Sequence, residues 1–115
     1  MPMTELHFIP AKTAAMRLGV PRTRIRQLDN ENKLVVVSRN GQSCVPEDFL
    51  LDRGGEIELV PMSGTITLLR DAGFEPEEII TWLFEIDEAL GDTPIALLRQ
   101  GKIKDVNRVA QTLGF

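Results

Sequence analysis

The segment PAKTAAMRLGVPRTRIRQLDNENKLVVVSRNGQSCV, residues 10–45, decides the fold of this chain. Its first half predicts two short helices, each opened by a proline. Pro10 and Pro21 suit the first turn of a helix, because proline lacks the N–H that this turn leaves unpaired. Gly19 supplies the left-handed residue with which many helices end. Two short helices joined by a glycine-containing turn predict a helix-turn-helix unit.

The second helix, expected from Pro21 to Glu31, combines a core-facing stripe with an arginine-rich face. Ile25 and Leu28 are spaced i, i+3, so both are expected on the buried side. Arginine can bind guanine through two N–H groups or clamp a phosphate, and glutamine can pair with adenine. We therefore expect this helix to enter the major groove of DNA. Its candidate contact residues are Arg22, Thr23, Arg24, Arg26 and Gln27.

A β-hairpin is expected directly after this helix. Residues 34–37, Leu-Val-Val-Val, form a β-branched run, and residues 43–45 can return beside it. Asn40 and Gly41 between them are a strong signal for a two-residue hairpin turn. A hairpin at this place makes the unit winged, with Arg39 and Asn40 at the tip as candidates for contact with a backbone phosphate or with the minor groove.

Charge is divided unevenly along the chain. The formal net charge is −4. Residues 10–45 nevertheless contain seven basic and two acidic residues, whereas residues 51–115 contain six basic and twelve acidic residues. A basic N-terminal part joined to an acidic C-terminal part favours nucleic acid as the partner of the N-terminal part. Lys12, Lys33 and Arg39 are expected on the DNA backbone.

Three regions are expected. Residues 1–9 are expected to be a flexible tail, residues 10–60 a winged helix-turn-helix DNA-binding domain, and residues 61–115 a helical C-terminal domain. A strand is expected at 56–60, with helices at about 63–72, 76–90, 94–99 and 103–113, the first of them capped by Ser63. The fold class is mainly α with a small β-hairpin: a winged helix-turn-helix followed by a C-terminal helical bundle.

The composition argues against an enzyme, a metal centre or a bound cofactor. His7 is the only histidine and falls in the expected tail, and Cys44 is the only cysteine and falls on an expected strand as a small core residue. No glycine-rich phosphate loop followed by Lys-Ser/Thr is present. No apolar run reaches the roughly 18 residues that span a membrane. One thiol and no export signal indicate the cytoplasm, where a DNA-binding protein would be nucleoid-associated.

Several motifs resemble known DNA-binding families. Residues 14–20, 25–28 and 33–34 with the hairpin are similar to the winged helix-turn-helix of excisionase and MerR-type proteins. Over residues 8–115 the chain resembles a family of small actinobacterial DNA-binding proteins with a winged head and a helical C-terminal domain. The residues that carry this resemblance are LGVP (18–21), LVVV (34–37), VP (45–46), TLL (67–69), GF (73–74) and ITWLF (80–84).

The family's prototype is a substrate of a membrane Ser/Thr protein kinase, which the resemblance adds as a candidate partner. Thr4 is the only hydroxyl residue in the short N-terminal extension and is the candidate phosphorylation site. A phosphate there would repel DNA by adding negative charge near the basic surface.

The C-terminal part is similar to a second family. Trp82, residues 89–98 (ALGDTPIALL), Gly101 and Val106 resemble the toxin-binding domain of Xre/MbcA/ParS-type antitoxins. This resemblance implies a protein partner at the C-terminal domain, although those antitoxins carry a different head. Two functions therefore stay open: a DNA-binding transcriptional regulator whose partner is double-stranded DNA, and a protein-interaction module or antitoxin-like adaptor.

Overall fold

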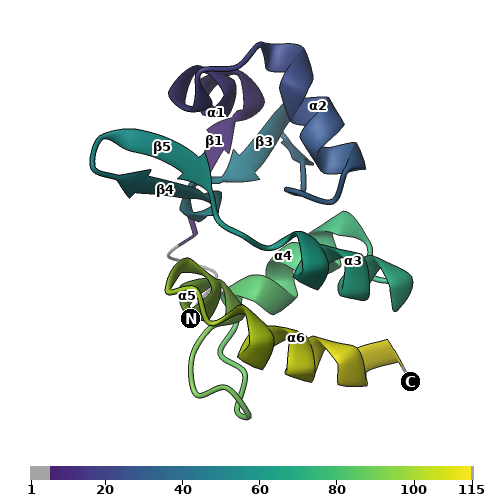
Figure 1. The fold of residues 1–115 in the computed structure, drawn as a ribbon. Coiled ribbons are helices and arrows are strands. Elements are labelled where there is room, and N and C mark those ends of the chain that lie inside the picture. Colours follow the sequence, from purple (N-terminus) through teal and green to yellow (C-terminus); the bar gives the residue numbers. More distant parts are fainter. Residues whose placement is uncertain (1–5, 115) are drawn as a thin grey trace.

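The computed structural model describes residues 6–114 and places a mixed head above a layer of helices (Figure 1). The head contains β1 (Phe8–Pro10), α1 (Ala11–Leu18), α2 (Arg22–Asn30), β2 (Val37–Arg39), β3 (Gln42–Pro46), a 3-10 turn (Glu47–Phe49), β4 (Leu50–Arg53) and β5 (Glu56–Leu59). The C-terminal part contains α3 (Ser63–Asp71), α4 (Pro76–Phe84), α5 (Pro94–Arg99), α6 (Ile103–Ala110) and a 3-10 turn (Gln111–Gly114). The predicted class, a winged helix-turn-helix followed by a helical part, is confirmed.

The two helices of the head form as the sequence predicts. Gly19 has φ 72° and ends α1. The N–H of Val20 then reaches back to the carbonyl of Ala15 at 3.0 Å, which satisfies a carbonyl at the end of the helix. In α2 the side chains of Ile25 and Leu28 are buried, so the predicted core-facing stripe is confirmed.

The wing is the outer part of a three-stranded antiparallel sheet with the order β1-β3-β2. Asn40 and Gly41 have φ 55° and 76°, the two positive values that a tight hairpin turn of this kind requires. The first strand of the wing, β2, begins at Val37, whereas the sequence predicted a start at Leu34. Leu34 and Val35 are instead fully buried in the core, where their side chains pack without forming a strand.

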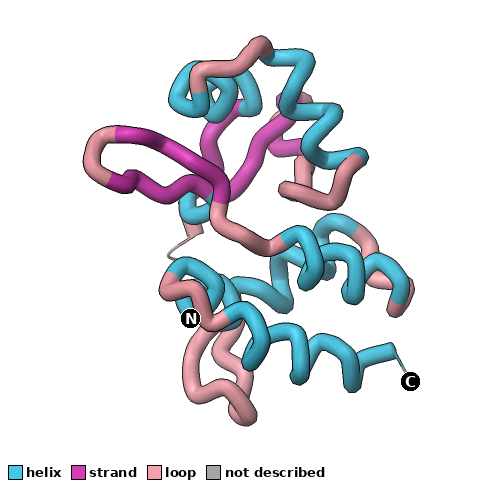
Figure 2. The backbone as a smooth tube through the Cα atoms, viewed as in Figure 1, coloured by secondary structure: helices cyan, strands magenta, loops and turns pink. Residues whose placement is uncertain are grey.

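Two further strands were not predicted from the sequence. Phe8–Pro10 pairs with residues 44–46 of β3, so the expected tail through residue 9 is too long. Leu50–Arg53 pairs with Glu56–Leu59, the strand that was expected at 56–60. Gly54 and Gly55 make the turn, and the N–H of Gly55 donates to Asp52 Oδ1 at 2.8 Å. Figure 2 shows this second hairpin projecting on the side of the head away from α2.

Two helices of the C-terminal part, α4 and α5, begin at side-chain caps. Glu75 and Glu78 form a capping box at the start of α4, and Thr93 accepts the N–H of Ala96 at the start of α5. The expected cap at Ser63 is wrong, because Ser63 is the first helical residue of α3 and the N-cap is Met62. The helix expected to continue to residue 90 ends at Phe84, and Asp87 and Asp92 form an isolated bridge across the loop that follows.

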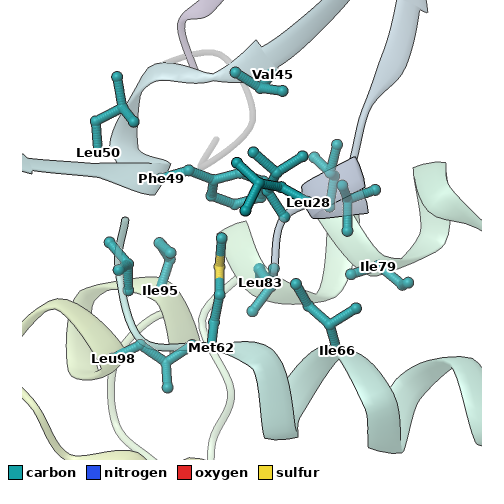
Figure 3. Close-up of a cluster of buried hydrophobic side chains, with 14 of the residues drawn as sticks. Leu28, Val45, Phe49, Leu50, Met62, Ile66, Ile79, Leu83, Ile95 and Leu98 are labelled. Atoms are coloured by element: carbon teal, nitrogen blue, oxygen red, sulfur yellow. The ribbon is translucent and has the colours of Figure 1, made fainter. Parts of the chain in front are cut away.

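One hydrophobic core joins the head to the C-terminal helices (Figure 3). Phe49 is fully buried between head residues such as Val45 and C-terminal residues such as Met62 and Leu83. Its ring centroid lies 6.1 Å from that of Phe84. The core therefore crosses the boundary expected between residues 60 and 61. In the described part of the chain, no helix has the length and apolar character needed to cross a membrane.

Candidate nucleic-acid interface

The outer face of α2 presents the residues that the sequence singled out. Arg22, Thr23, Arg26 and Gln27 are exposed, while Ile25 faces inward. Arg22 and Arg26 are one helical turn apart, so their side chains share a face. Within residues 6–114, neither arginine forms an ion pair. Two cations not engaged by protein carboxylates are thus available to an anion.

A hollow of about 550 Å³ separates α2 from the wing. Arg22, Thr23 and Arg26 line it from the helix, and Ser38 and Ser43 line it from β2 and β3. The two serines are register partners, so their side chains lie on the same face of the hairpin. Guanidinium and hydroxyl groups are donors to phosphate and to base edges, which makes this hollow suited to nucleic acid.

Arg24 lies on the flank of α2, and its side chain contacts two side chains of the same segment. Its Nη1 donates to Gln27 Oε1 at 3.0 Å and approaches Glu31 Oε2 at 3.4 Å. Glu31 therefore offsets part of its charge. The amide nitrogen of Gln27 remains a donor for a base edge.

Arg39 is engaged by the C-terminal part. Its Nη1 and Nη2 donate to the two carboxylate oxygens of Glu77 at 2.6 and 3.0 Å, and its guanidinium lies 4.3 Å from the centre of the Phe8 ring. The two hydrogen bonds raise the pKa of Arg39 and lower that of Glu77. Neither Arg39 nor Asn40 lines the hollow between α2 and the wing.

The two candidate lysines take different positions. Lys12 is exposed in the first turn of α1. Lys33 lies 3.7 Å from Glu31 and lines a different hollow, formed with residues 59–64 and Ile103 of α6. The structure thus places Lys33 away from the hollow between α2 and the wing.

A network at the end of α2 escaped the sequence analysis. Arg70 of α3 donates to the carbonyl and the carboxylate of Asp29, at 2.9 and 2.6 Å, and to Asn32 Oδ1 at 2.6 Å. Asn32 has φ 62° and donates to Thr67 Oγ1 at 2.9 Å. Arg70 and Asp29 are 41 residues apart, so no local pattern could have paired them. Ser38 and Ser43 were also overlooked, although strand alternation around the Asn40 turn would have placed them on one face.

Comparison with known proteins identifies the family. A family model described as "DNA-binding protein Rv2175c, wHTH domain" matches residues 3–50, and one described as "Rv2175c C-terminal domain of unknown function" matches residues 60–114. DNA-binding protein Rv2175c of Mycobacterium tuberculosis (strain ATCC 25618 / H37Rv) is 31% identical over 110 residues, which cover 85% of this chain and 74% of that protein. This chain belongs to the Rv2175c family. The NMR structure of Rv2175c superposes with a TM-score of 0.79 at 28% identity, over 95% of this chain and 82% of that chain.

The whole-chain resemblance expected from the sequence is confirmed by these matches. In the terms of the Rv2175c family, α2 and the wing belong to the winged domain, whereas Arg70 and Glu77 belong to the domain of unknown function. The ion pairs Arg39–Glu77 and Arg70–Asp29 therefore join one family domain to the other.

The remaining candidates have simple surroundings. His7 is exposed, and Cys44 is buried as expected for a small core residue. Trp82 is half-buried beside Phe74 on the surface of α4. Across residues 6–114, no cluster of three or more His, Cys, Asp or Glu residues could hold a metal ion. Thr4, the candidate phosphorylation site, lies outside the described residues.

Proposed function

We propose that this member of the Rv2175c family is a transcriptional regulator that inserts α2 into the major groove of double-stranded DNA. The observation that carries the proposal is the pair Arg22 and Arg26, exposed on one face of α2 and lining one hollow with Ser38 and Ser43. The helix-turn-helix places the outer side chains of its second helix against base edges. The relative in Mycobacterium tuberculosis is named a DNA-binding protein, which agrees with this assignment.

The proposal assigns different roles to the candidate residues. Base edges are read by Arg22, Thr23, Arg26 and Gln27, while Lys12 and Arg24 contact phosphates from either side. Asn40 approaches the backbone from the wing tip. Arg39 can bind a phosphate only if it gives up its hydrogen bonds to the Glu77 carboxylate. Lys33 adds to the attraction of DNA through its positive charge, without direct contact.

Selection from a random duplex library tests this function. Wild-type protein should enrich a defined motif, because side chains on α2 contact base edges. In a mobility-shift titration with the enriched duplex, Arg22→Ala combined with Arg26→Ala should weaken binding at least about tenfold, as expected for two lost contacts of about 1–3 kcal/mol each. Arg108→Ala is the matched control, since Arg108 is an exposed cation on α6. No enriched motif, or equal affinity of the double variant, would reject the proposal.

A protein partner at the C-terminal part is a second candidate function. A hollow of about 860 Å³ lies between the head and α5, lined by Leu51, Phe84, Ile95 and the largely exposed Ile86. Part of its wall comes from the segment that resembles antitoxins. Purification from native cells, with and without nuclease, distinguishes the two functions. A stoichiometric protein that persists after nuclease, without enriched DNA, would favour the second.

Regulation by a Ser/Thr kinase at Thr4 follows only from the family resemblance. It predicts that phosphorylation of Thr4 weakens DNA binding through charge repulsion. The mobility shift of Thr4→Glu against Thr4→Val measures this effect, and equal affinities would argue against such a switch. DNA binding would also place the protein on the nucleoid.

A further inference from the structure

Arg70 of α3 holds the C-terminal end of the DNA-facing helix α2. It donates three hydrogen bonds, one to the carbonyl of Asp29, one to the carboxylate of Asp29 and one to the side chain of Asn32. The side chains of Arg70 and Asp29 are 26% and 25% exposed, so water screens this contact less than it screens the other ion pairs of the head. A cation at this end of a helix also complements the partial negative charge of its unpaired carbonyl groups.

Asp29 also lines the hollow between α2 and the wing. Among the described residues that line this hollow, it is the only one with a carboxylate. It lies three positions after Arg26, a spacing at which side chains on a helix meet. Without Arg70, this carboxylate could pair with Arg26 and would repel a phosphate in the hollow.

We propose that Arg70 is a positioning residue for DNA binding, and that it completes the DNA-facing hollow by withdrawing the charge of Asp29 from it. The inference rests on the proposed DNA-binding function and gives the C-terminal domain a part in it. Arg70 neutralises Asp29 and leaves Arg26 unpaired for DNA. The link from Asn32 to Thr67 fixes the same end of α2 to α3 a second time.

Four variants test this role in the full chain: Arg70→Met, Asp29→Asn, both together, and Arg108→Met. Methionine keeps the aliphatic length of arginine without its charge. Arg108 is 74% exposed on α6, so its replacement removes the same charge without touching α2. Affinity is measured by fluorescence anisotropy with a fluorescein-labelled duplex of mixed sequence at low salt, and folding is checked by circular dichroism.

Arg70→Met should bind the duplex about fivefold more weakly, as expected for one uncompensated charge near a phosphate. Adding Asp29→Asn should restore binding to within about twofold of wild type, since the offending charge is gone. Arg108→Met should bind like wild type. A purely structural role predicts the opposite for the double variant, because it loses still more of the network.

The proposal is overturned if folded Arg70→Met binds like wild type, or if the double variant binds no better than Arg70→Met. If Arg70→Met does not fold, Asp29→Asn alone decides. It should bind at least as tightly as wild type, and weaker binding by the folded variant overturns the proposal. A wild-type protein without affinity for the duplex, or an Arg22→Ala, Arg26→Ala variant with unchanged affinity, would reject the DNA-binding function itself.

Discussion

Arg39 at the tip of the wing donates two hydrogen bonds to Glu77 of α4, at 2.6 and 3.0 Å. The contact fastens the wing to the C-terminal helices, and it occupies the guanidinium that the sequence assigned to the DNA backbone. A phosphate and the Glu77 carboxylate therefore compete for the same two donors.

Glu77→Gln is expected to increase affinity for DNA about threefold, because a neutral amide competes less well than a carboxylate for Arg39. The measurement is a mobility-shift titration with the selected duplex. Glu88→Gln is the control, since it removes an equal charge from an exposed residue of the loop after α4. Equal affinities of the Glu77 and Glu88 variants would show that Arg39 does not exchange Glu77 for phosphate.

The same pair predicts a pH dependence of stability. Hydrogen bonds from Arg39 lower the pKa of Glu77 below its ordinary value of 4.5. The pair therefore stabilises the fold above this value, and the stabilisation is lost as the pH falls through the lowered pKa. Because the Glu77 side chain is 59% exposed, the contribution should be about 0.2–1 kcal/mol. Urea unfolding of wild type and Glu77→Gln should differ at pH 6 and converge near pH 3. A constant difference across this range would contradict the assignment.

The shared core predicts that the two family domains unfold together. Phe49 is fully buried against both parts, and Phe49→Ala should reduce the free energy of unfolding by about 3–5 kcal/mol. Trp82 fluorescence and circular dichroism should follow one coincident transition in urea for wild type. Two separated transitions would instead support independent domains at the expected boundary of residues 60 and 61.

A part-buried hydrogen bond between α3 and α6 gives a prediction for the C-terminal part. Thr65 is fully buried, and its Oγ1 donates to Asn107 Oδ1 at 2.5 Å. Thr65→Val leaves that oxygen without its donor and should cost about 1–3 kcal/mol in thermal or urea unfolding. Thr81→Val on the exposed face of α4 is the matched substitution and should be nearly neutral. Similar losses in both variants would point to the valine side chain as the cause.

Local signals in the sequence were sufficient for the two helices of the head and for the turn of the wing. The spacing of Ile25 and Leu28, the stop at Gly19 and the turn at Asn40 act over a few residues, and each predicted a feature that the structure shows. The outer face of α2 followed from the same spacing, because residues opposite a buried stripe must be exposed.

Long-range pairing was beyond those signals. The strand at Phe8 forms because it pairs with the edge of β3. Leu34 is not part of the expected strand because its side chain is buried in the core. Arg39 was judged by its own neighbours in sequence, and Arg70 was not singled out at all. Their partners Glu77 and Asp29 lie 38 and 41 residues away. The charge of a candidate site depends on such partners, so its composition alone overstated the availability of Arg39.

The most direct test of the account is a titration of ¹⁵N-labelled protein with the selected duplex, followed by NMR. If α2 lies in the major groove with the wing beside it, the largest amide shift changes fall in residues 22–30 and 38–43. Small changes are expected at the β4–β5 hairpin and on α6. Changes concentrated on α5 and α6, with α2 unaffected, would contradict the central claim that this chain reads DNA through Arg22 and Arg26.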